Sequence, residues 1–359
     1  MKTKICLFFL LIAILFAFSC KKDTPQTSDI QNNRSLKSGL LSFSINGELV
    51  PAAIDTTLNT ISIIIPYSQN LNSLIANFTL ASQVNASVNN AAVKSGFVFN
   101  FSNPVVFTIT SADKTRSSSF KVIVQTNLQY FGLTGNIISG NSLIRDYEYY
   151  FDQFDGSTFQ LANCGPAVST MAIKWADSTF SQTPAQARTI VRPQGGGWST
   201  DDVQAYLNSN GVNNVADTIS NLDTLVKKNV DNGNELILCL DMYYVEFNDV
   251  YYQHLSKFYT TPAPAWGHFL LVKGYQQSSN NNFYLQVYDP YSQGERYGAI
   301  ADNQLKGKDR YYYDYDIRLA TNNWWPYAII VFPKGSKTGN LSNLKVKTLG
   351  RKVPVATGM

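Results

Sequence analysis

Cys164 stands where the sequence predicts the first turn of a helix. Pro166 suits the first helical position, which needs no backbone donor, and an apolar stripe follows at helical spacing, made of Val168, Met171, Ala172 and Trp175. Free backbone N–H groups and the positive end of the helix dipole favour the thiolate, which is the nucleophilic form of cysteine. Cys164 is therefore a candidate nucleophile.

His268 and Asp289 are the candidate partners of this thiol. The apolar run bounded by Gly267 and Gly274 predicts a buried strand with His268 at its start. The next predicted strand, 284–288, runs directly into Asp289. A hairpin between the two strands would bring Asp289 close to His268, so that the carboxylate orients the imidazole and the imidazole shares a proton with the thiol.

In this order, the motifs NCGPA, GHFLLVKGY and a strand that ends in DP resemble the papain-like cysteine peptidases, specifically the family-39, bacteriocin-processing-like branch. The resemblance covers roughly residues 147–333. It implies Cys164 as nucleophile, His268 as general base and acid, and Asp289 as the orienting residue. It also implies an oxyanion-hole glutamine upstream of the cysteine. We prefer Gln153, at the end of the aromatic run 147–152, to Gln160.

The same residues also have purely structural interpretations. A lone cysteine is often a small buried hydrophobe, His268 could be a core histidine, and Asp289 with its proline could form a simple turn. Cys239 lies in a continuous apolar run and is expected to be structural, although a disulfide between Cys164 and Cys239 would silence the thiol. The second histidine, His254, has no partner motif and is expected at the surface.

The N-terminus predicts export. Two lysines precede an apolar run from residue 5 to 18, which is typical of a secretory signal peptide. The small residues before Cys20 resemble a bacterial lipoprotein signal, which implies that Cys20 is acylated and contacts membrane lipid. We expect a location in the cell envelope of a Gram-negative bacterium, either periplasmic or on the outer surface. The run is too short for a spanning anchor, which needs about 20 residues.

Charge and length bound the remaining possibilities. The chain has 359 residues and a formal charge of +4, which falls to +2 when cleavage removes two lysines. A nearly neutral chain without a basic stripe gives no reason to expect a nucleic-acid partner. The length favours two domains. We expect a monomer with no metal and no cofactor.

The composition and the pattern of apolar residues change along the chain. We expect a signal peptide over 1–19, a flexible tether over 20–37 and an all-β domain over 38–125, where strands about ten residues apart predict a sandwich. That domain resembles the immunoglobulin-like modules of surface lipoproteins. We then expect a linker over 126–145, a papain-like α+β peptidase domain over 146–335 and a C-terminal tail over 336–359. The expected organisation is therefore multidomain.

These features predict an envelope-anchored cysteine peptidase that hydrolyses peptide or protein substrates through a thioester at Cys164. Two alternatives stay open at this point. The domain could have lost turnover and bind a peptide or glycan, or the thioester could pass to an amine, as in an acyl or peptidyl transferase.

Overall fold

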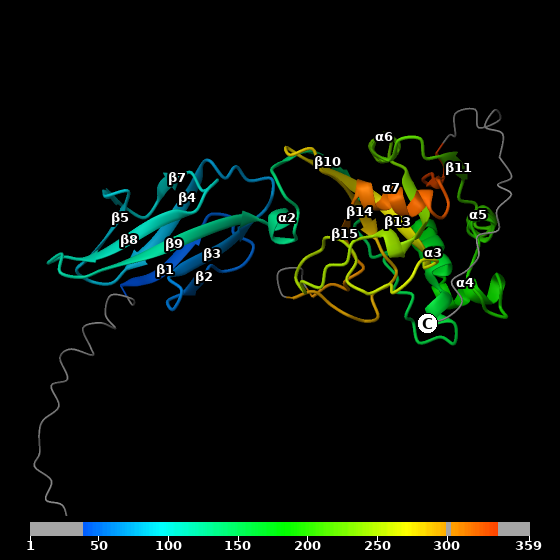
Figure 1. The fold of residues 1–359 in the computed structure, drawn as a ribbon, viewed down its shortest axis with the longest axis horizontal. Coiled ribbons are helices and arrows are strands. Elements are labelled where there is room, and N and C mark those ends of the chain that lie inside the picture. Colours follow the sequence, from blue (N-terminus) through cyan, green and yellow to red (C-terminus); the bar gives the residue numbers. More distant parts are fainter. Residues whose placement is uncertain (1–38, 299–302, 337–359) are drawn as a thin grey trace, which may run out of the picture.

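The computed structural model describes residues 39–298 and 303–336. The chain is multidomain, with an all-β N-terminal domain followed by an α+β domain. Figure 1 shows the two bodies side by side, with the short helix α2 (Asn127–Tyr130) between them. The expected signal peptide, the expected tether with Cys20 and most of the expected C-terminal tail lie outside the described residues. Within the described part, no helix combines the length and the apolar character needed to cross a bilayer.

The N-terminal domain consists of two sheets. One has the strand order β1-β4-β7 and the other β2-β3-β9-β8-β5-β6; β3 and β9 pair in parallel. Their alternating apolar residues meet in one core, which includes Phe43, Phe78 and Phe107. The strands are β1 (Leu40–Ile45), β2 (Ala53–Asp55), β3 (Thr60–Ile65), β4 (Leu74–Leu80), β5 (Val84–Val88), β6 (Ala91–Val93), β7 (Phe97–Phe99), β8 (Val105–Ser111) and β9 (Ser117–Thr126).

The C-terminal domain is built on a seven-stranded sheet. Its order is β11-β16-β12-β13-β14-β15, and β10 pairs with β13. The strands are β10 (Ile137–Ser142), β11 (Asn214–Thr218), β12 (Glu235–Asp241), β13 (Gly267–Ser278), β14 (Phe283–Tyr288), β15 (Arg310–Tyr313) and β16 (Tyr327–Val331). The helices are α3 (Cys164–Ala176), α4 (Pro184–Ile190), α5 (Thr200–Ser209), α6 (Leu222–Asp231) and α7 (Asp314–Asn322), with 3-10 turns η1 (Gln160–Ala162) and η2 (Met242–Tyr244).

Helices cover both faces of this sheet, which explains the continuous apolar runs of β12 and β13. Ile237 and Cys239 of β12 point toward the core shared with α3 and α5. Leu236 and Leu238 point to the opposite core, shared with α6 and α7. The sheet therefore fixes the level at which each of its strands begins and ends, and the site residues lie at one such edge.

Local signals define several helix starts. Ser199 caps α5 and Thr183 caps α4, each in a capping box with the residue three positions later. The segment 126–145, expected as a linker, instead contains α2 and β10, and β10 joins the sheet of the C-terminal domain. Because β10 is half-buried and polar, its strand character depends on pairing with β13 rather than on its own sequence.

Candidate functional site

Cys164 is the first residue of α3, and Asn163 is the N-cap. The cysteine is half-buried and free. Pro166 occupies the third helical position rather than the predicted first, but this still lies in the first turn, where backbone donors have no intrahelical partner. Its ring therefore removes no helical hydrogen bond, and the turn that carries the thiol forms without strain.

The rest of α3 is buried on nearly every side, beyond the single apolar stripe that the sequence predicts. Val168, Met171 and Trp175 all lie in the core, and so do polar neighbours such as Ser169. Cys239 lies nearby in β12 as a buried free thiol, and burial raises its pKa well above the usual value. Neither cysteine forms a disulfide in the described part of the chain. The helix thus gives Cys164 a rigid base.

His268 and Asp289 lie at the adjoining ends of two neighbouring antiparallel strands. His268 is the second residue of β13, and Asp289 follows the last residue of β14. The His268 Nε2 atom is 2.8 Å from Asp289 Oδ1, and both side chains are buried. Cys164 also raises the pKa of the imidazole, which means that the thiol lies near the ring. Since Nε2 is occupied by the carboxylate, Nδ1 is the nitrogen left for the thiol.

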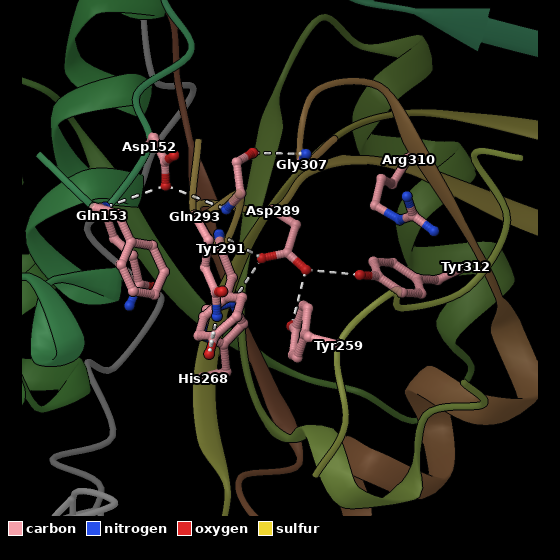
Figure 2. A network of polar contacts seen from close by, with 12 residues as sticks. Asp152, Gln153, Tyr259, His268, Asp289, Tyr291, Gln293, Gly307, Arg310 and Tyr312 are labelled. Carbon is pink, nitrogen blue, oxygen red and sulfur yellow. Dashed lines mark hydrogen bonds and ion pairs between the residues drawn. The ribbon is translucent and has the colours of Figure 1, made fainter. Parts of the chain in front are cut away.

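Two tyrosines complete the surroundings of Asp289 (Figure 2). The hydroxyls of Tyr312 and Tyr259 donate hydrogen bonds of 2.7 and 3.0 Å to Oδ2. The backbone N–H of Tyr291 donates to Oδ1 over 2.9 Å. Burial, followed by the charge of Asp289, raises the pKa of both tyrosine hydroxyls well above 10, so they stay protonated and act as donors. Sequence reasoning missed Tyr259 and Tyr312, because no motif marks them.

The backbone of Asp289 is fixed as well. The Tyr150 hydroxyl donates to the Asp289 carbonyl over 2.7 Å, and the Asp289 N–H donates to the Gly307 carbonyl over 2.8 Å. A Cβ atom at Gly307 would lie 1.9 Å from the Asp289 carbonyl oxygen. Only glycine permits this close approach of two backbone segments. The carboxylate is therefore held from both its side chain and its main chain.

The electrostatics of the pair favour charged forms on both sides. Burial alone would lower the pKa of His268, but the charge and hydrogen bond of Asp289, together with Cys164, outweigh it and raise the pKa to about 10. Burial opposes ionisation of Asp289 too, yet His268 and the hydrogen bond from Tyr312 hold its pKa below 3.8. The imidazole is thus protonated at neutral pH and can act as a proton donor.

Gln153 bridges the segments on either side of the site. Its backbone N–H donates to the Pro290 carbonyl over 2.7 Å, and its Nε2 donates to the Gln160 carbonyl over 3.1 Å. The aromatic run 147–152 before it forms no strand. The Gln160 side chain is turned to the backbone of Gly156 instead. Of the two glutamines, Gln153 is the one that contacts both the residues before Cys164, through its side chain, and those after Asp289, through its backbone.

The prediction that His254 lies at the surface is wrong. The side chain is 2% exposed and stacks between the rings of Phe131 and Tyr297, at 3.8 and 3.6 Å between centroids. Burial lowers its pKa to about 3. The rings that bury His254 come from residues far away in the sequence, so no local pattern predicts its burial. His254 is a neutral core residue.

Among the residues that the structure describes, no group of three or more His, Cys, Asp or Glu side chains could hold a metal ion. The arrangement that does exist is an imidazole hydrogen-bonded to a carboxylate, with a thiol near enough to raise the pKa of the ring. Such a set can generate a nucleophile, move a proton between sulfur and a leaving group, and keep the imidazole oriented while it does so.

Two family models match the chain. Residues 40–124 match the family described as "SGBP, N-terminal", and residues 145–317 match the "Peptidase_C39 like family". The second match spans the candidate site. A comparison with curated proteins found no match.

Three solved structures align with parts of this chain. A protein assigned as a C39-like peptidase from Bacillus anthracis is 12% identical over 54% of this chain and 97% of its own, with a TM-score of 0.34. One assigned as a glycoside hydrolase from Bacteroides thetaiotaomicron is 11% identical over 82% and 94%, with a TM-score of 0.22. One assigned as secreted, from Bacteroides fragilis, is 15% identical over 24% and 71%, with a TM-score of 0.18. At these TM-scores the alignments bear on neither fold nor function.

Proposed function

We propose, from the premise that residues 145–317 form a Peptidase_C39-like domain, that this domain is an active cysteine peptidase with a papain-like arrangement. The observation that carries the proposal is the buried contact between His268 and Asp289, with Cys164 near enough to raise the pKa of the same imidazole. An imidazole held by a carboxylate and facing a thiol at a helix N-terminus is the arrangement that covalent catalysis by cysteine requires.

The residues can be assigned steps that balance. The Cys164 thiolate attacks the carbonyl carbon of the scissile peptide bond and forms a tetrahedral intermediate. The His268 imidazolium donates its proton to the leaving nitrogen, the C–N bond breaks, and a thioester remains. Water then attacks the thioester while His268 accepts its proton, which releases the acid product and restores the thiolate. Asp289 keeps the imidazole oriented through both steps.

The negative oxygen of each intermediate needs donors. The backbone N–H of Cys164, at the start of α3, is one candidate, and the Gln153 side chain is the second. In the structure the Gln153 amide donates to the carbonyls of Gln160 and Leu161. To donate to the oxyanion, the Gln153 side-chain amide must therefore turn from these carbonyls toward the substrate. A change in its terminal side-chain torsion would achieve this.

The decisive experiment compares Cys164→Ala with Cys239→Ala, a matched removal of the buried thiol. A peptide library is incubated with each mature protein and the products are resolved by mass spectrometry. We expect cleavage by the parent and by Cys239→Ala, and none by Cys164→Ala, with unchanged folding. Iodoacetamide should label Cys164 rapidly near neutral pH. A Cys164 thiol that reacts as slowly as an ordinary cysteine would falsify the proposal.

The absence of any product from the parent, together with unchanged peptide or glycan binding by Cys164→Ala, would favour a binding protein over an enzyme. Products that carry an added amine instead of water would favour a transferase.

Location belongs to the same proposal. We place the protein in the cell envelope, anchored through acylated Cys20, with the immunoglobulin-like N-terminal domain as a spacer or binding module. The match of residues 40–124 to the "SGBP, N-terminal" family supports a dedicated N-terminal module. Cys20→Ala should abolish incorporation of labelled fatty acid and move the protein from the membrane fraction to the soluble fraction. Unchanged membrane association would contradict the anchor.

A further inference from the structure

Arg188 is a buried cation beside the candidate nucleophile. It lies in the last turn of α4 and is 3% exposed. Its guanidinium donates to the Ala162 carbonyl over 2.6 Å, to Asn163 Oδ1 over 2.9 Å and to the Gly196 carbonyl over 2.5 Å. Two of these acceptors belong to the two residues that immediately precede Cys164. The fork of Arg188 therefore fixes the start of α3 from outside the helix.

The surroundings of the guanidinium hold it in place. Its central carbon lies 6.0 Å from the ring centroids of both Phe159 and Trp198. Trp198 in turn packs against the residue after the nucleophile, since a Cβ atom at Gly165 would come within 2.6 Å of the Trp198 Cβ. The same cluster thus contacts the chain on both sides of Cys164.

The charge of Arg188 lacks an ordinary counterion. Within residues 39–298 and 303–336, no carboxylate forms an ion pair with it, whereas nearby Arg192 pairs with Asp202 at 2.7 Å. A buried charge is costly without compensation. Burial lowers the pKa of Arg188, and the negative charge of Cys164 is the largest influence in the opposite direction. Because electrostatic interaction is mutual, the guanidinium stabilises the thiolate as much as the thiolate stabilises the guanidinium.

We propose that Arg188 is a positioning residue for the nucleophile, which fixes residues 162–163 by hydrogen bonds and favours the Cys164 thiolate by its charge. The inference rests on the proposed role of Cys164. Arg188 lies on a separate helix from Cys164 and does not belong to the set of Cys164, His268 and Asp289. The inference makes it a further residue that determines the reactivity of the thiol.

The test measures alkylation of Cys164 by iodoacetamide as a function of pH, by mass spectrometry on the mature full-length protein. We expect the alkylation rate at pH 7 to fall about tenfold in Arg188→Met, because residues 162–163 lose their hydrogen bonds and the site loses a buried positive charge. Arg192→Met removes a more exposed arginine nearby and serves as the matched control, with an unchanged profile.

Arg188→Lys separates charge from geometry and keeps the test decisive where the Met variant fails to fold. Lysine retains the charge but lacks the planar fork. We expect it to keep most of the reactivity at pH 7 and to lose peptide turnover. A folded Arg188→Met protein with the parent's profile, or a lysine variant equal to the parent in both rates, overturns the inference. Slow alkylation of the parent itself would instead count against the proposed function.

Discussion

The Tyr312 hydroxyl donates a hydrogen bond of 2.7 Å to Asp289 Oδ2, on the oxygen opposite the one that His268 contacts. With Tyr259 on the same oxygen, the carboxylate has its acceptor sites occupied and cannot rotate without breaking several bonds. Because a buried carboxylate is costly unless it is hydrogen-bonded, this arrangement explains how Asp289 stays ionised at 0% exposure beside His268.

Removal of this donor should weaken both folding and activity. We expect Tyr312→Phe to lower the free energy of unfolding by about 1.5–3 kcal/mol, because a hydrogen bond to a charged group is lost in the interior. Turnover should fall, since the carboxylate no longer holds the imidazole as firmly. Urea denaturation and peptide hydrolysis measure the two effects. Tyr313→Phe is the control, because the Tyr313 ring packs against Tyr284 and, within the described residues, no hydrogen bond joins its hydroxyl to Asp289; equal losses in both variants would contradict the role of Tyr312.

The charge of His268 should depend on Asp289. In the parent, we expect the imidazole to be protonated at pH 7 and to titrate with a pKa of about 10. In Asp289→Asn the largest raising influence disappears while burial and Cys164 remain, so the pKa of His268 should fall. The chain has only two histidines, which makes nuclear magnetic resonance titration direct. His254, with a pKa lowered to about 3, is the internal reference that stays neutral. A neutral His268 in the parent at pH 7 would oppose this assignment.

The raised pKa of His268 predicts how stability depends on pH. The folded protein holds this proton more tightly than the unfolded chain, so the contribution is fully present below pH 6.5 and is lost as the pH rises through about 10. The difference in unfolding free energy between the parent and His268→Gln should therefore shrink across this window. For His254→Gln the difference should stay flat, because the His254 pKa lies well below it. A flat difference for His268→Gln as well would exclude the linkage.

Substitution of the two glutamines should affect kcat to different extents. We expect Gln153→Ala to lower kcat about 10²–10³-fold, the usual cost of losing an oxyanion donor, and to leave alkylation of Cys164 unchanged, since alkylation develops no oxyanion. Gln160→Ala should retain most of the activity because its side chain accepts from the Gly156 backbone. A larger loss in Gln160→Ala than in Gln153→Ala would reverse the assignment.

Close backbone packing at Gly307 gives a structural prediction. Gly307→Ala would set a Cβ atom 1.9 Å from the Asp289 carbonyl oxygen and 2.3 Å from the Tyr150 hydroxyl. We expect a loss of at least about 1–3 kcal/mol of unfolding free energy, typical of overpacking, together with lower turnover. Gly298→Ala is the control, because its nearest neighbour would lie at an ordinary 3.5 Å. Equal thermal stability of the two variants would contradict the close approach.

The sequence by itself determined what depends on neighbouring residues. The helix at Cys164, the capped starts of α4 and α5, and the buried β13 and β14 were predictable because capping and apolar periodicity act within one or two turns or along one strand. The adjacency of His268 and Asp289 followed from a single hairpin. The family resemblance rested on these same local motifs.

Only the tertiary structure decided what long-range packing controls. β10 became a strand by pairing with β13, and His254 proved to be buried by two aromatic rings from distant segments. No sequence motif marks the hydrogen bonds that Tyr259 and Tyr312 donate to Asp289. The same holds for the hydrogen bonds that the Arg188 guanidinium donates to the residues before Cys164. A hydrogen bond between residues far apart in the chain depends on where the whole sheet and its helices place them, and local propensity carries no information about that placement.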